Sequence, residues 1–210
     1  MTKIISHMIF LILAIISLMI YPILNNANLE YHILKVPIID DAIPLITIFV
    51  IPYILYIPYL FFSTIYFSLF SKNYIWFVLS LVGIEILSGL IFYFYQTHVP
   101  RPQIVNVDIL STLLNFVYSV DKPYNCFPST HASLTTLFTF FWLKEDFFIN
   151  SVLRRYSLLG ISFLIIISTV FVKQHYILDV FAGVGLALLM VHVVQNILNS
   201  DSGLNFLPKT

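Results

Sequence analysis

The chain has 210 residues, of which 60% are hydrophobic, 17% aromatic and only 10% charged, and its mean hydropathy is +0.95. One soluble core cannot bury that much apolar surface, so the composition excludes an ordinary water-soluble domain and predicts a polytopic membrane protein. Ten basic and ten acidic residues leave no formal net charge and form no cluster, which argues against a nucleic-acid partner. Cys126 is the only cysteine, which excludes an internal disulfide and a cysteine-based metal site.

Six apolar stretches approach or exceed the roughly 20 residues that a helix needs to cross a bilayer. They lie at about residues 4–24, 45–71, 75–95, 131–148, 157–173 and 176–198. We therefore expect an all-α bundle of six transmembrane helices, forming a single integral membrane domain over residues 1–210. No clear cleavage site follows the first stretch, so we expect a retained helix and not a signal peptide. Because barely two residues separate the last two stretches, we expect them to form a tight hairpin.

The basic residues of the loops predict how the bundle lies in the membrane. With the N-terminus inside, the cytoplasmic side holds Lys3, Lys72, Lys144, Arg154, Arg155 and Lys209, and the outer side holds Lys35, Arg101, Lys122 and Lys173. The frequent use of Ile, Asn and Phe is typical of AT-rich bacterial genomes, so we expect the bacterial cytoplasmic membrane. The long polar connection 96–129 then lies on the extracytoplasmic side.

Three short motifs reach that outer side: VPRPQ (99–103), CFPSTHAS (126–133) and KQHYILDV (173–180). Arg101 offers a planar guanidinium that suits phosphate oxygens, and Lys173 adds an ammonium group. Ser129 and Thr130 stand just before an apolar helix, where they can cap it and where free N–H groups can bind an anion. His131 is expected in the first turn of that helix.

His175 and Asp179 are four residues apart, which on a helix places them on one face. The carboxylate can then accept the proton of one ring nitrogen and leave the other as a nucleophile. We expect phosphoryl transfer without a cofactor or metal, in which His175 attacks phosphorus, Asp179 stabilises the imidazolium and His131 protonates the leaving oxygen. A metal held by the two histidines and the aspartate is the alternative.

The order of these residues resembles the type 2 phosphatidic acid phosphatase superfamily of membrane lipid phosphatases and phosphotransferases. That family carries a lysine seven residues before Arg-Pro, then Pro-Ser-Gly-His, then Ser-Arg followed by a histidine and an aspartate. The matching positions are Arg101-Pro102, Pro128-Ser129 with His131, and Ser168 with His175 and Asp179. The resemblance implies a six-helix bundle, a phosphorylated lipid substrate and an active site at the outer leaflet.

Three positions depart from the family pattern: Phe94 replaces the lysine, Thr130 the glycine and Thr169 the arginine. Because the fifth span is predicted to reach residue 173, positions 169 and 173 should share a helical face about 6 Å apart in height, and the Lys173 ammonium should reach the same phosphate. Lys122 and His98 are further candidate cations from the loop. Fewer cations suit a phosphodiester, and the pattern is similar to the branch of inositol phosphorylceramide and sphingomyelin synthases.

Three functions stay open at this point. The first is a lipid phosphatase that hydrolyses a phosphomonoester or diphosphate at the outer membrane face through a phosphohistidine. The second is a phosphotransferase that moves a phospho-headgroup between lipids, and the third is a non-enzymatic lipid carrier. A carrier should place charges at several depths, whereas Glu85 alone lies between the two membrane sides. We expect Glu85 to be structural, because it lies about half a membrane from the motifs.

The motif residues also have structural alternatives. For the His175–Asp179 pair, the alternative is a purely structural role in stabilising the hairpin. For Arg101-Pro102, it is an interfacial anchor and turn. Lys173 could extend its ammonium to lipid headgroups while its methylene groups stay in the apolar layer. The three motifs share one predicted side of the membrane, and this favours the catalytic interpretation.

Overall fold

The computed structural model describes residues 2–25, 30–105 and 108–200. Within these ranges the regular elements are helices, accompanied by two isolated β-bridges, and the all-α prediction is confirmed. Lys209, which entered the orientation argument, lies outside the described residues.

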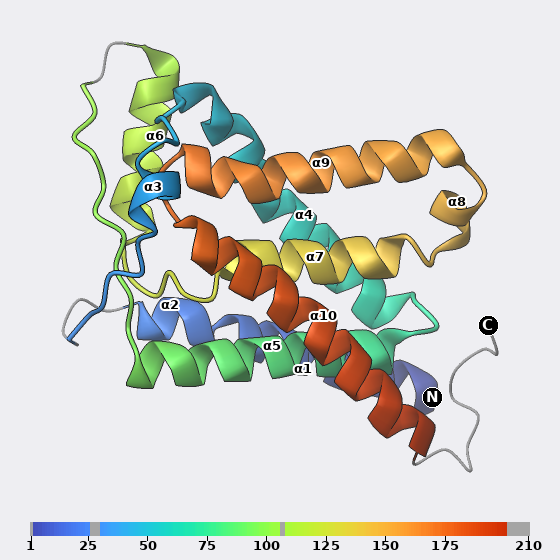
Figure 1. The fold of residues 1–210 in the computed structure, drawn as a ribbon. Helices are drawn as coiled ribbons and strands as arrows, with labels where there is room; N and C mark the ends of the chain where they lie inside the picture. The colour runs from blue at the N-terminus through green and yellow to red at the C-terminus, as the bar shows by residue number, and fades with distance from the viewer. Residues whose placement is uncertain (1, 26–29, 106–107, 201–210) are drawn as a thin grey trace.

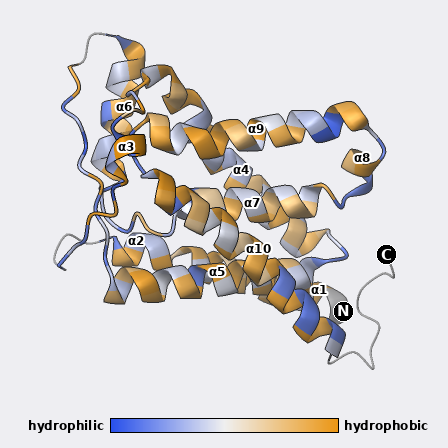
Figure 2. Ribbon diagram, in the orientation of Figure 1, coloured by the Kyte–Doolittle hydropathy of each residue, from blue (hydrophilic) through white to orange (hydrophobic). Residues whose placement is uncertain are grey.

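In the described part of the chain, five helical segments are long and apolar enough to cross a membrane. They are α1 with α2 (Thr2–Leu18 and Ile20–Leu24), α4 (Val50–Leu69, preceded by the 3-10 turn Thr47–Phe49), α5 (Tyr74–Phe94), α9 (Val152–Phe171) and α10 (Ile177–Ser200). Large apolar side chains on them stay exposed, among them Phe62, Phe94 and Leu153. Figure 2 shows hydrophobic residues along these helices and hydrophilic residues mainly near their ends and in the loops. These features indicate an integral membrane protein.

The fourth predicted span, 131–148, differs from the prediction. It forms α7 (Thr130–Trp142), a helix of 13 residues, followed by the short helix α8 (Asp146–Ile149). At 1.5 Å per residue, α7 is about 20 Å long, which is less than the hydrocarbon thickness of about 30 Å. It is nonetheless the central helix of the bundle, because α4, α5, α9 and α10 all pack against it (Figure 1). The described residues thus give five long apolar helices and one short buried helix.

The connection 96–129, predicted as a polar loop, contains the helix α6 (Ile109–Val120). Asp108 begins this helix with a capping box, in which its carboxylate accepts the Ser111 N–H and the Ser111 hydroxyl accepts the Asp108 N–H. Leu114 and Val117 then pack on α4. Helix α6 therefore runs across one end of the bundle, close to the short helix α3 (Pro37–Asp40), as Figure 1 shows.

The expected hairpin between the last two helices is only partly correct. The connection is short, but α10 does not run back along α9; it crosses over α7 and packs on α7 and α5 (Figure 1). Helix α9 ends at Phe171, and Lys173 adopts a left-handed backbone conformation with φ of 54°. The prediction that Lys173 extends the helical face of Thr169 is therefore wrong. Instead, the N–H groups of Gln174 and His175 both donate to the Thr169 carbonyl.

Aromatic side chains form the core near the α8 end of the bundle. Phe77 of α5 lies 4.9 Å from Phe67 of α4, 5.9 Å from Phe138 and 5.4 Å from Phe141 of α7, measured between ring centroids. All four rings are fully or almost fully buried. This cluster fixes α4, α5 and α7 against one another, so their opposite ends can present polar groups at defined positions.

Candidate active site

His131 and His175 lie beside each other although 44 positions separate them. Their ring centroids are 5.7 Å apart and their planes make an angle of 62°. The starts of α7 and α10 are in contact, because the Ser129 N–H donates to the Asp179 carbonyl at 2.9 Å. Gly183 permits this approach, since a Cβ there would lie 2.4 Å from the Ser129 carbonyl oxygen. The backbone contact therefore brings the two histidines together.

His175 pairs with Asp179, but for a different reason from the one expected. Nδ1 of His175 lies 3.5 Å from Oδ2 of Asp179, and both side chains are buried. His175 precedes α10, so the two residues do not share a helical face, and the spacing argument was wrong. Asp179 instead folds back over the helix start, where its Oδ2 accepts the Tyr176 N–H at 2.8 Å. This places the carboxylate beside the imidazole.

The N-terminus of α7 offers anion-binding groups. Ser129 is the N-cap, one of the two caps considered, and its Oγ accepts the Ala132 N–H at 3.3 Å. The N–H groups of Thr130 and His131 donate to no group in the described part of the chain. Both residues are buried, so their N–H groups are shielded from bulk water and can bind a ligand at the helix end.

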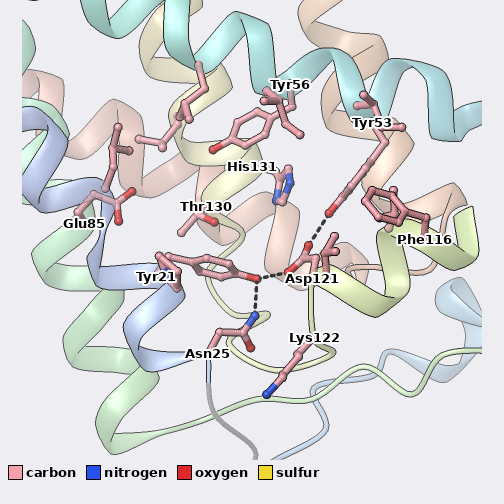
Figure 3. Close-up of a pocket in the computed structure, with 18 of the residues that line it drawn as sticks. Tyr21, Asn25, Tyr53, Tyr56, Glu85, Phe116, Asp121, Lys122, Thr130 and His131 are labelled. Atoms are coloured by element: carbon pink, nitrogen blue, oxygen red, sulfur yellow. Dashed lines mark hydrogen bonds between the residues drawn. The ribbon is translucent and has the colours of Figure 1, made fainter. Parts of the chain in front are cut away.

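Two tyrosines of α4 hold the His131 ring between them. Its centroid lies 4.8 Å from that of Tyr53 and 4.2 Å from that of Tyr56. The Tyr53 hydroxyl donates to Asp121 Oδ2, and the Tyr21 hydroxyl donates to Asp121 Oδ1, each at 2.6 Å (Figure 3). Asp121 therefore connects α2 to α4 and fixes the ring that stacks on His131.

Sequence reasoning missed this tyrosine clamp. Tyr53 and Tyr56 are three residues apart, which places them on one face of a helix, and that spacing was the available signal. Aromatic residues are common in membrane-interface belts, so the pattern did not distinguish a clamp from ordinary packing.

Arg101 lies on the Asp121 side of the site. Its Nη1 donates to the Asp121 carbonyl at 2.8 Å, and its guanidinium carbon is 4.8 Å from the centre of the Tyr118 ring. Its Nε is buried without a hydrogen-bond partner among the described residues. Arg101 is thus held by the hydrogen bond from Nη1 and by its contact with the Tyr118 ring, and its buried Nε–H is available as a donor.

Lys173 lies in a different environment from the one expected. Its ammonium donates to the backbone carbonyls of Asp40 and Ile43, and Asp40 Oδ1 accepts the Ile177 N–H at 3.0 Å. Lys173 therefore fastens the α3 segment to the connection between α9 and α10.

Three of the other positions considered as cation sites supply little positive charge. Phe94 is 77% exposed, and the Thr169 hydroxyl donates to a carbonyl of its own helix. Burial and the nearby Arg101 charge lower the pKa of His98, which disfavours its cationic form. Lys122 is exposed and lines the cavity next to His131.

That cavity has a volume of about 620 Å³ and lies between α1, α2, α4, α5, α6 and α7 (Figure 3). Its walls include both His131 and Glu85. Glu85 and His131 thus line one cavity, which extends from the start of α7 to the middle of α5. Within the residues that the structure describes, no cluster of three His, Cys, Asp or Glu side chains is placed to hold a metal ion.

Comparison with known proteins gives one match. The family model of the PAP2 superfamily matches residues 73–201, which is more than half of the chain. The matched range contains Arg101, Ser129, His131, His175 and Asp179. No curated protein and no solved structure matches the chain.

Proposed function

The chain belongs to the PAP2 superfamily, and on that premise we propose that it is a membrane lipid phosphatase with His175 as its nucleophile. Its substrate is a lipid phosphomonoester or diphosphate. The observation that carries the proposal is the approach of two imidazoles to 5.7 Å, one of them beside a buried carboxylate. A phosphoryl group in contact with both rings has a nucleophile and a proton donor available.

The first step forms a phosphohistidine. Nδ1 of His175 faces Asp179, so Nε2 attacks phosphorus and the bond from phosphorus to the lipid oxygen breaks. The leaving oxygen takes a proton from His131, and Asp179 stabilises the positive charge on the His175 ring. The N–H groups at the start of α7 and the Arg101 guanidinium stabilise the phosphoryl oxygens.

The second step releases phosphate. His131, now neutral, takes a proton from water, and the resulting oxygen attacks phosphorus. The bond between phosphorus and His175 Nε2 breaks, which regenerates both histidines and yields inorganic phosphate. The tyrosine clamp keeps the His131 ring in one orientation through both proton transfers.

In this proposal the site faces the extracytoplasmic side of a bacterial cytoplasmic membrane. At the α8 end of the bundle, Lys72 and Lys144 lie in connections, and Arg154 and Arg155 lie in the first turn of α9 (Figure 1). At the opposite end, Arg101 and Lys173 are bound to backbone carbonyls, which leaves Lys35 and Lys122 as the basic residues to compare. This distribution supports an inner location for the α8 end. We also take α7 as a sixth crossing, since the surrounding helices shield it from lipid. Labelling of a cysteine introduced at Lys122 by an impermeant reagent in intact cells tests the orientation.

Phosphotransfer to a second lipid alcohol is the second candidate. The cavity beside His131 has mainly apolar walls, which suits a lipid acceptor better than bulk water. The positions of Phe94 and Thr169 also lack the cations expected for a dianionic monoester. In this version, His131 activates the lipid hydroxyl in the second step instead of water.

Turnover by purified variants tests the proposal. Phosphatidic acid, an isoprenyl diphosphate and intact phospholipids are incubated with the protein, and both free phosphate and new phospholipid are measured. We expect His175→Ala and His131→Ala each to lower turnover at least roughly a thousandfold. His192→Ala, an exposed histidine near the other end of α10, is the matched control and should retain full activity. Unchanged turnover in His175→Ala would exclude the proposed nucleophile.

A further inference from the structure

Glu85 is a buried carboxyl group in the middle of α5. Its side chain is 2% exposed, and its Oε2 has no hydrogen-bond partner among the described residues. A carboxyl group at this depth is costly when it stays unpaired, so such residues usually serve a ligand or a polar neighbour. The described part of the chain supplies no ionic partner for it: the salt bridges there join Lys35 to Asp41 and His175 to Asp179.

The Glu85 side chain faces the cavity that His131 and Thr130 also line (Figure 3). Between these polar groups the wall is apolar, with contributions from Leu60 and Leu134. Pro22 and Ile57, on α2 and α4, line the cavity and are exposed on the side of the bundle. The cavity therefore combines a reactive imidazole, an apolar wall and two carboxyl groups. Asp121 already accepts the hydroxyls of Tyr21 and Tyr53, whereas Glu85 Oε2 has no hydrogen-bond partner among the described residues.

Burial without a partner does not by itself distinguish Glu85. Ser80 and Ser88, on the same helix, are also fully buried and have unpaired hydroxyl oxygens, but neither lines the cavity. A helical serine can also turn its hydroxyl to a backbone carbonyl of the preceding turn, whereas a carboxylate cannot donate there. Glu85 is thus the one of these three groups that is placed to meet a ligand.

We propose that this cavity binds the lipid part of the substrate and that Glu85 accepts a hydrogen bond from a free hydroxyl group of that lipid. The inference rests on the proposed function, in which the phosphate lies at His131 and His175. A hydroxyl group both donates and accepts, so it pairs with the Glu85 carboxyl group in either protonation state. An ester carbonyl pairs only with the protonated form, and an isoprenoid chain has no polar group to offer. The substrate class is therefore a phosphorylated lipid with a free hydroxyl group on the backbone next to the phosphate.

Matched substrates test this assignment. One is an alkylglycerol phosphate with a free middle hydroxyl group, and the other is its deoxy analogue without that group. We expect the intact protein to prefer the hydroxylated compound by about tenfold or more in kcat/KM, because a site built to bind a hydroxyl rejects the analogue that lacks it. Glu85→Leu should bring the ratio close to one, because it lowers kcat/KM for the hydroxylated compound. Glu85→Gln, whose amide oxygen still accepts, should give an intermediate ratio.

Ser88→Ala is the matched control, since it alters a buried unpaired group on the same helix outside the cavity, and it should leave the ratio unchanged. The melting temperature of each variant in detergent confirms folding. A ratio near one in the intact protein, or an equal loss on both substrates in Glu85→Leu, would overturn the assignment.

A binding measurement separates this inference from the proposed function. The unphosphorylated alkylglycerol and its deoxy analogue are compared by the shift in melting temperature that each causes, which needs no phosphoryl chemistry. We expect a larger shift with the alkylglycerol, and this difference should disappear in Glu85→Leu. Selective binding without phosphate release would refute the phosphatase and keep the hydroxyl site. Phosphate release with equal binding and equal rates would refute the hydroxyl site alone.

Discussion

The two ends of the helix bundle differ in what their buried side chains do. At the α8 end, Phe67, Phe77, Phe138 and Phe141 fill the space between helices with aromatic rings. At the α6 end, the start of α7 presents His131, and the start of α10 presents Asp179 beside His175, all in buried positions. There, His175 Nδ1 and Asp179 Oδ1 lack hydrogen-bond partners among the described residues. Unpaired buried polar atoms cost stability, whereas packed rings contribute to it. Chemistry and stability are thus separated between the two ends of the bundle.

Among the changes that compare the two ends, the largest effect is expected from changing a carboxylate to an amide at the α6 end. Asp179→Asn can still accept the Tyr176 N–H but can no longer stabilise a positive His175 ring. We expect kcat to fall roughly a hundredfold to a thousandfold, with little change in melting temperature. Steady-state phosphate release and a thermal melt in detergent measure the two quantities.

The matched carboxylate is Glu145, near α8, which accepts the hydroxyls of Tyr66 and Ser71. Glu145→Gln should keep kcat and alter only stability, slightly. If both amide variants lost activity to a similar degree, the assignment of catalysis to the α6 end alone would be wrong.

Phe138→Ala should have the reverse effect. Removing this fully buried ring leaves a cavity beside Phe77 and Tyr59, so we expect a loss of roughly 3–5 kcal/mol in unfolding free energy. The kcat of the molecules that remain folded should stay unchanged. Unfolding by denaturing detergent, with turnover corrected for the folded fraction, checks both statements. A stable variant with reduced kcat would contradict the comparison.

The contact between α7 and α10 affects both stability and kcat. A Cβ at Gly183 would lie 2.4 Å from the Ser129 carbonyl oxygen, so Gly183→Ala must push the two helix starts apart. We expect a loss of about 1–3 kcal/mol in stability together with reduced kcat, because the separation of His131 and His175 increases. Gly185→Ala is the control, since nothing lies within 4 Å of a Cβ there. Gly185→Ala should be neutral or slightly stabilising. Similar effects of the two changes would show that the close contact at Gly183 does not position the two histidines.

The smallest expected effect concerns the tyrosine clamp. Tyr53→Phe keeps the ring on His131 but removes the hydrogen bond to Asp121, so we expect kcat to fall by about threefold to tenfold. Tyr59→Phe, on the same helix, removes a contact of 3.2 Å with the Thr139 hydroxyl and should leave kcat unchanged. Equal kcat in Tyr53→Phe and the unmodified protein would show that Asp121 does not position the clamp.

The apolar runs predicted the long helices because crossing a bilayer imposes a length and a composition that single stretches display. The site was less accessible to such reasoning. Hydropathy extended the fourth span to Phe148, although the chain after Trp142 turns into α8. It also left out α6, because this apolar helix of 12 residues is shorter than a membrane span.

The motifs identified His131, His175 and Asp179, but not how they are held. The His175–Asp179 spacing suggested a shared helical face, whereas Asp179 folds back from the first turn of α10. Asp121 and Tyr53 meet across 68 positions of sequence, and Glu85 reaches the His131 cavity from another helix. Such contacts depend on how helices pack, and one sequence carries no local pattern for them.

A phosphohistidine is lost in acid and must be kept in alkali. The most direct test of the proposed mechanism is therefore to trap the phosphohistidine. The protein is mixed with a radiolabelled lipid phosphate, quenched in alkali within one turnover, and mapped by peptide mass spectrometry. We predict label on His175, present in the intact protein and in His192→Ala and absent from His175→Ala. Label on another residue, or phosphate release with no covalent label at any time, would contradict the central claim.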